Sequence, residues 1–232
     1  MDFITACREG NLEYLKTFDL YKIDIHADND FAFRLACEGG YLEVAKWLYK
    51  VSNETFGLST SERKSPIDIH ANNEEPFRYT CRAGHLELAK WLYEVGNETF
   101  DLSERKNPIN IHAYNDQAFH HTCDNGHLEV VKWIYEICDE IKNPIELNIE
   151  YEFTFRDAIM NGYFELTKWL YGITVKRKNP INIGNDNDFV FHLAYKKGHY
   201  KIVRWLFTFY PTKYIKKNFL SFLGREELEN RR

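Results

Sequence analysis

An internal repeat marked by glycine and tryptophan constrains the fold of this chain more than any other feature. The five tryptophans each stand seven residues after a glycine, at Trp47, Trp91, Trp133, Trp169 and Trp205. The glycines are Gly40, Gly84, Gly126, Gly162 and Gly198, and Gly10 begins the series as a partial unit. Seventeen residues before each of the five glycines is the isoleucine that opens an Ile-x-Ile or Ile-x-Leu segment. Repeats of roughly 20 to 50 residues are typical of chains that bury a core only by stacking their units.

Each unit is predicted to contain two helices joined at the glycine. The first is expected to begin after an acidic residue ten positions before the glycine, such as Asp30 or Asp116, because a carboxylate can cap free amides at a helix start. The glycine supplies a left-handed turn, and the second helix carries an amphipathic stripe. The predicted fold class is therefore all-α: a solenoid of stacked helix-turn-helix units with connecting β-hairpin-like loops.

Residues 31–48, Phe-Ala-Phe-Arg-Leu-Ala-Cys followed by Gly40-Tyr-Leu-Glu-Val-Ala-Lys-Trp-Leu, resemble an ankyrin repeat, as do residues 119–132 and 191–199. The distance from Gly10 to Gly40 is 30 residues, where an ankyrin repeat has about 33. This shortened unit is similar to the ankyrin-repeat proteins of giant DNA viruses of the mimivirus type. The resemblance implies an ankyrin repeat domain over residues 1–210, followed by a basic capping segment over 211–232. Its units would be 1–22, 23–66, 67–108, 109–144, 145–180 and 181–210.

The histidines and cysteines follow the repeat, which favours structural roles. Eight of the nine histidines stand at repeated positions, and only His121 does not. Cys7, Cys37, Cys81 and Cys123 share the position three before the glycine, which is interpreted as a small buried slot. A zinc site needs four convergent ligands, whereas stacked units would spread these residues along the chain. The sequence predicts no catalytic residue, metal or cofactor; an enzyme would require a cleft that gathers His121, Cys123 and a carboxylate.

The tips of the connecting loops are the predicted partner-binding surface, because loops held by a constant scaffold commonly carry binding. We expect a non-enzymatic interaction protein that binds another protein through these tips and the inner-helix face. The partner would be a host protein if the viral resemblance holds. Several tip residues are acidic, which favours a basic or polar partner. Tyr114, Tyr151 and Met160 are expected to be exposed and to anchor the partner. The residues in this prediction are Asp28, Asn29, Asn72, Asn73, Tyr114, Asn115, Glu150, Tyr151, Asp186 and Met160.

The charge distribution supplies an alternative. Residues 1–194 carry 20 basic and 32 acidic side chains, whereas residues 195–225 carry eight basic and no acidic ones. Basic residues among aromatics can bind an anionic ligand such as nucleic acid or a membrane surface, here through Lys213, Lys216 and Lys217. The interpretation that the sequence favours for the same segment is a cap whose lysines face water. Nucleic acid is not the partner that the sequence favours.

The remaining expectations concern location and assembly. No apolar run approaches the roughly 20 residues that span a bilayer, and Met1-Asp2-Phe3-Ile4 does not read as a secretory signal. Five thinly spread cysteines indicate reduced thiols. We therefore expect a monomeric protein, without a transmembrane segment, in the cytoplasm of a cell, which would be the host cell if the protein is viral.

Overall fold

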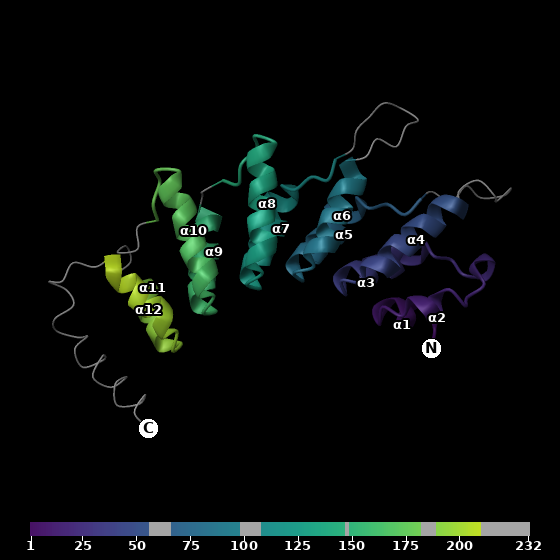
Figure 1. Ribbon diagram of the computed structural model, residues 1–232, viewed down its shortest axis with the longest axis horizontal. Coiled ribbons are helices and arrows are strands. Elements are labelled where there is room, and N and C mark those ends of the chain that lie inside the picture. Colours follow the sequence, from purple (N-terminus) through teal and green to yellow (C-terminus); the bar gives the residue numbers. More distant parts are fainter. Residues whose placement is uncertain (56–65, 98–107, 147–148, 182–188, 210–232) are drawn as a thin grey trace, which may run out of the picture. The chain divides into compact units, whose positions relative to one another are not determined.

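A computed structural model describes residues 1–55, 66–97, 108–146, 149–181 and 189–209 (Figure 1). The chain divides into two compact units, Met1–Glu146 and Leu147–Arg232, which we describe one at a time. The predicted capping segment 211–232 lies outside the described residues, as do Asp186, Lys213, Lys216 and Lys217. The division into one repeat domain and a cap therefore stays a prediction.

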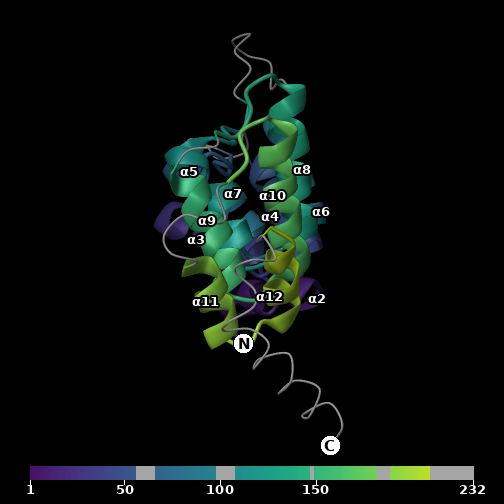
Figure 2. The ribbon, with the colours of Figure 1, turned by 90° about the vertical axis from the view of Figure 1, so that its left-hand side faces the viewer.

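The first unit is a series of helix pairs. The pairs are α1 (Phe3–Arg8) with α2 (Leu12–Leu15), α3 (Ala27–Glu38) with α4 (Leu42–Thr55), α5 (Ala71–Arg82) with α6 (Leu86–Asn97), and α7 (Ala113–Asp124) with α8 (Leu128–Glu140). A short 3-10 helix, η1 (Leu20–Lys22), follows the first pair. The inner helices α1, α3, α5 and α7 pack in order against one another. The outer helices α4, α6 and α8 lie together on the other side of this row (Figure 2).

The second unit repeats the same arrangement twice. It contains α9 (Ile149–Met160) with α10 (Phe164–Lys176), and α11 (Phe189–Lys196) with α12 (Tyr200–Leu206), followed by the 3-10 helix η2 (Phe207–Phe209). Helix α9 packs against α11, and α10 against α12. The described residues of both units contain helices and turns but no strand. The prediction of an all-α fold built from repeated helix pairs is confirmed for the described residues.

The core of the first unit forms where successive pairs meet. Phe33 and Phe77 are completely buried on their inner helices, and burying a side chain of this size contributes roughly 1.5–3 kcal/mol. Trp91 of α6 packs against Phe33 and against Tyr49 of α4, with ring centroids 6.4 and 5.8 Å apart. Trp133 of α8 makes the equivalent contacts with the preceding pair. The repeated tryptophan is therefore a contact between pairs rather than within one.

A second contact between pairs explains the repeated glycine. Gly40 has φ +74°, a left-handed backbone that glycine adopts without steric cost. The imidazole of His85, from the next pair, lies directly on it, so that a Cβ added to Gly40 would be 2.4 Å from Nδ1. The His85 Nε2 donates to the Glu38 carbonyl at 3.0 Å. In the second unit His199 lies on Gly162 and donates to the Met160 carbonyl at 2.8 Å. The structural role that the repeat predicted for the histidines is confirmed at these two positions.

Three glycines of the second unit allow the left-handed backbone and the histidine contact to be tested separately. Gly162→Ala disturbs both the backbone and the histidine contact, because φ is +79° and His199 Nδ1 would be 2.6 Å from the new Cβ. Gly198→Ala disturbs only the backbone, because φ is +79° but no atom lies within 4 Å of the new Cβ. We expect Gly198→Ala to lower the free energy of unfolding by about 1–2 kcal/mol. Gly162→Ala should lower it by roughly another 1 kcal/mol, because the histidine hydrogen bond is also lost.

Gly172→Ala is the matched control, because Gly172 lies inside α10 with no atom near the added Cβ. Replacing a helical glycine by alanine should raise stability by up to about 1 kcal/mol. Urea unfolding of the three variants measures these differences. Equal losses for Gly162→Ala and Gly198→Ala would contradict the role given to the histidine.

Candidate interaction surface

The tips, which lie at the start of the inner helices α3, α5 and α7, have an unusual backbone. Three consecutive non-glycine residues have positive φ, between 52° and 66°, at residues 28–30, 72–74 and 114–116. Asparagine and aspartate tolerate this left-handed conformation better than other residues, but each such residue still costs of order 1–3 kcal/mol. These tight turns stand where the sequence predicted β-hairpin-like loops. A backbone of this kind persists only when surrounding contacts hold it.

A buried carboxylate holds the first of these tips and joins it to the next pair. Asp30 is only 7% exposed. Its Oδ1 accepts a hydrogen bond from His26 Nδ1 at 2.7 Å, and its Oδ2 accepts from the backbone amide of Asp68, in the next pair, at 3.0 Å. We call this arrangement of histidine, carboxylate and neighbouring amide the carboxylate bridge. It differs from the predicted helix cap, because the bonds go to a preceding histidine and to another pair.

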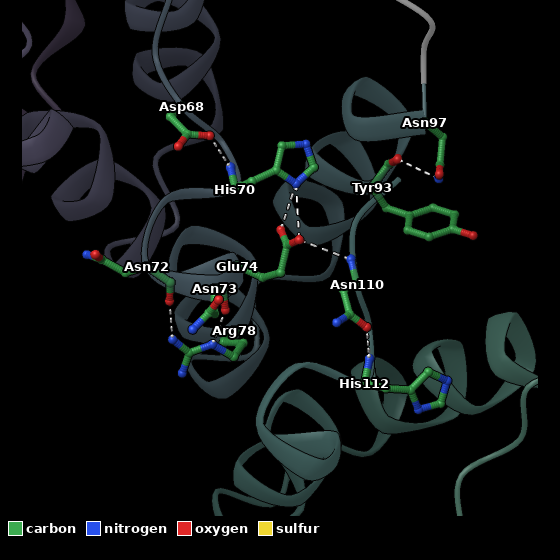
Figure 3. Close-up of polar contacts among 10 residues, drawn as sticks. All are labelled: Asp68, His70, Asn72, Asn73, Glu74, Arg78, Tyr93, Asn97, Asn110 and His112. Carbon is green, nitrogen blue, oxygen red and sulfur yellow. Dashed lines mark hydrogen bonds and ion pairs between the residues drawn. The ribbon is translucent and has the colours of Figure 1, made fainter. Parts of the chain in front are cut away.

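Glu74 forms a second carboxylate bridge, one pair further on (Figure 3). It is 6% exposed, and its carboxylate accepts from His70 Nδ1 at 3.0 and 3.1 Å and from the Asn110 amide at 3.1 Å. The carboxylate raises the pKa of His70, first through the hydrogen bond and also through its charge. Asp116 accepts from His112 in the same way. Bonds to a charged acceptor are stronger than neutral ones, so the bridge is a firm connection.

An arginine holds each of the first two tips from the other side. Arg78 of α5 donates from Nε to the Asn73 carbonyl at 2.8 Å and from Nη2 to the Asn72 carbonyl at 3.0 Å. Its Nη1 donates to Gln117 Oε1 on the next inner helix. Arg34 makes the equivalent contacts to the Asp28 carbonyl and to the Glu75 carboxylate, both at 2.9 Å. The carbonyls of Asp28, Asn72 and Asn73 are therefore held in place by side chains of the chain itself.

The predicted tip residues of the first unit are exposed and partly in contact. Asp28, Asn29, Asn72, Asn73, Tyr114 and Asn115 are all exposed. Tyr114 is 59% exposed, accepts a hydrogen bond at its hydroxyl from Asn73 Nδ2 at 3.0 Å, and has the Arg78 guanidinium 4.6 Å from its ring centroid. The structure therefore brings Asn73 and Tyr114 together across two pairs.

The prediction that Tyr151 is an exposed anchor is wrong. Tyr151 lies inside α9, is 1% exposed, and donates from its hydroxyl to the Leu170 carbonyl at 2.8 Å. At this repeat Asn148 stands where the earlier units have histidine, so the same carboxylate bridge cannot form, and the acid Glu152 is exposed. The missing histidine was the sequence signal for this difference. Met160 is half-buried, and Glu150 begins the same helix.

The cysteines lie away from the surface. All five are buried, and burial raises the pKa of the Cys7 thiol to about 12 and that of Cys123 well above its usual value. Thiols of this kind react slowly, since the thiolate is the nucleophile. His121 is partly exposed whereas Cys123 is buried, so the structure does not present the two side chains together at the surface. In the described part of the chain no three potential metal ligands gather.

Comparison with known proteins gives a fold-level likeness. No family model matches the chain, and no curated protein matches it. The chain is similar to the X-ray structure of an ankyrin repeat family protein from Legionella pneumophila. The two share 20% sequence identity with a TM-score of 0.43, over 93% of this chain and 71% of the other. None of the described helices combines the length and the apolar character that crossing a membrane requires.

The carboxylate bridge should contribute measurably to stability. Replacing Glu74 with alanine leaves the Asn110 amide and the His70 imidazole without their acceptor, and should lower the free energy of unfolding by about 2 kcal/mol. Glu87→Ala is the control, because Glu87 only pairs with Lys90 on an exposed face, where such a pair is worth about 0–1 kcal/mol. Urea unfolding compares them, and equal losses would contradict the bridge.

The bridge also predicts a pH dependence. The folded pKa of His70 is raised above its usual value, so its charged contact with Glu74 is fully present below the unfolded pKa, roughly 6.5. The contribution is lost as the pH rises through the folded pKa. A double-mutant cycle with His70→Gln and Glu74→Gln should give a larger coupling energy at pH 6 than at pH 9. The cycle removes the effects of the other histidines, and identical coupling at both pH values would contradict this account.

Proposed function

We propose that this chain is a non-enzymatic, ankyrin-type interaction protein that binds another protein through its tips and inner-helix face. The observation that supports this most directly is Tyr114, which is largely exposed and yet already ordered by Asn73 and Arg78. Exposed aromatic side chains in fixed positions are typical anchors of protein interfaces. Because the tip is ordered before binding, little entropy is lost on association.

The proposed surface consists of Asp28, Asn29, Asn72, Asn73, Tyr114 and Asn115. Its side chains offer amide donors and acceptors, one carboxylate and one phenol, which suit a polar partner surface. Tyr151 is no longer part of the proposal because it is buried. If the likeness to giant-virus ankyrin proteins holds, the partner is a host protein, and the protein acts as a monomer in the host cytoplasm.

A second candidate function is binding of an anionic ligand through residues 195–225. The described residues that favour it are all exposed: Lys196 on α11, Lys197 in the turn that follows it, and Lys201 and Arg204 on α12. The sequence from 189 to 209 contains no acidic residue. Binding to a 12-nucleotide deoxythymidine strand or to anionic vesicles should weaken steeply with salt. Unchanged binding after Lys196→Glu with Lys201→Glu would count against this candidate.

A variant of the tip tests the proposed function. Tyr114→Ala removes an exposed ring without disturbing the core, so thermal stability should stay nearly unchanged while retention of a protein partner falls about tenfold or more. Partners captured from host-cell lysate by the tagged chain, measured by quantitative mass spectrometry, supply the readout.

The control for this test is Lys50→Ala on the outer helix α4, where the side chain is 72% exposed. This variant should retain the same partners as the unmodified chain. Partner recovery that is equal for Tyr114→Ala and for the unmodified chain would count against the tips as the binding surface.

A further inference from the structure

Two neighbouring inner helices bring positive charge and aromatic surface together on the first unit. The Arg82 and Arg78 guanidinium groups of α5 lie 5.7 and 5.9 Å from the ring centroid of Tyr79. His121 lies on α7, which packs against α5. Its pKa is lowered, first by burial and then by the positive charge of Arg82 and Arg78. We call these four residues, Arg78, Tyr79, Arg82 and His121, the arginine–histidine cluster.

The members of the cluster differ in what they can offer to a ligand. Arg78 is 8% exposed and its guanidinium is occupied by the tip carbonyls and Gln117, so it contributes charge rather than donors. Arg82 is exposed, and its stem and guanidinium lie along Tyr79. His121 and Tyr79 are partly exposed. A group that binds here therefore meets one accessible guanidinium, one imidazole and one aromatic ring.

The charge around the cluster limits the size of an anionic ligand. Glu38 on α3 and Asp124 on α7 stand at the position that Arg82 has on α5, two residues before the repeat glycine. The positive charge of Arg82 is therefore flanked by acidic positions on both neighbouring helices, and the acidic position on α3 separates it from Arg8 on α1. The chain as far as residue 194 has 12 more acidic than basic side chains, and this field opposes a long polyanion such as nucleic acid.

We infer that the arginine–histidine cluster binds an acidic segment of the protein partner, with a carboxylate on Arg82 and His121 and an adjacent side chain on Tyr79. This rests on the proposed function and names the chemistry of the partner at one point of the surface. Guanidinium and carboxylate form paired, charge-assisted hydrogen bonds. The partial burial of His121 and Tyr79 strengthens such a contact, since screening by water is weaker there.

A defined peptide tests this inference without the natural partner. The probe is a fluorescein-labelled pentapeptide, Gly-Glu-Glu-Leu-Gly with a blocked carboxyl end, titrated with the full chain at low salt and followed by fluorescence anisotropy. We expect saturable binding that weakens at least tenfold in Arg82→Glu and several-fold in Arg82→Gln and His121→Gln. Both positions reach the surface, and circular dichroism verifies that each variant remains folded.

The matched control is Lys50→Glu on the outer helix α4, which changes the net charge by the same amount as Arg82→Glu. It should leave the affinity within about twofold. The inference is overturned if the unmodified chain shows no saturable binding at millimolar concentration, or if Lys50→Glu weakens binding as much as Arg82→Glu. It is also overturned if a 12-nucleotide deoxythymidine strand binds as tightly as the peptide.

The outcome is separable from that of the proposed function. If Arg82→Glu leaves peptide binding unchanged while Tyr114→Ala still loses the protein partner, the inferred binding by the cluster is wrong and the proposed interaction surface at the tips is retained. If the peptide binds through Arg82 but the chain retains no protein partner, the cluster does bind acidic peptides and the proposed function is wrong.

Discussion

The carboxylate bridge is the interaction on which the first unit depends. A tip of three left-handed residues is strained, and the amides of the following segment need acceptors that the helices cannot supply. One buried carboxylate meets both needs, because Asp30 bonds to His26 within its own tip and to the Asp68 amide of the next pair. The shape of each tip is therefore set together with the position of its neighbour.

Two other contacts join successive pairs at different levels of the unit. At the turn between the helices the imidazole of His85 lies on Gly40, and between the helices Trp91 packs on Phe33 and Tyr49. Polar, backbone and apolar contacts thus repeat in the same order from pair to pair. The residues that repeat in the sequence are those that make these contacts, and the exposed residues between them are free to vary. This division is what makes the tips suitable for binding.

Much of the fold could be predicted from the sequence because its signals are local. Helical spacing, the glycine turn and small residues such as Ala36 depend only on neighbours along the chain. The left-handed tips could not be predicted, because aspartate and asparagine, as at Asp28 and Asn29, are also common in hairpin turns. The contact that holds the tip is also distant in sequence, since the acceptor of the Asp68 amide lies 38 residues away. The burial of Tyr151 was not predicted, because its place in the repeat matches that of Asn29, Asn73 and Asn115, which are exposed. The arginine–histidine cluster could not be predicted either, because it depends on which helices pack together, here α5 against α7.

Amide hydrogen exchange tests the central claim most directly. The backbone amide of Asp68 has a side-chain acceptor on the preceding pair and no helical one. If the carboxylate bridge is present in solution, this amide should exchange as slowly as the helix amides of α5, and Asp30→Ala should remove that protection while α5 keeps its own. Exchange of the Asp68 amide at the rate of an unstructured peptide, with α5 protected, would contradict the account.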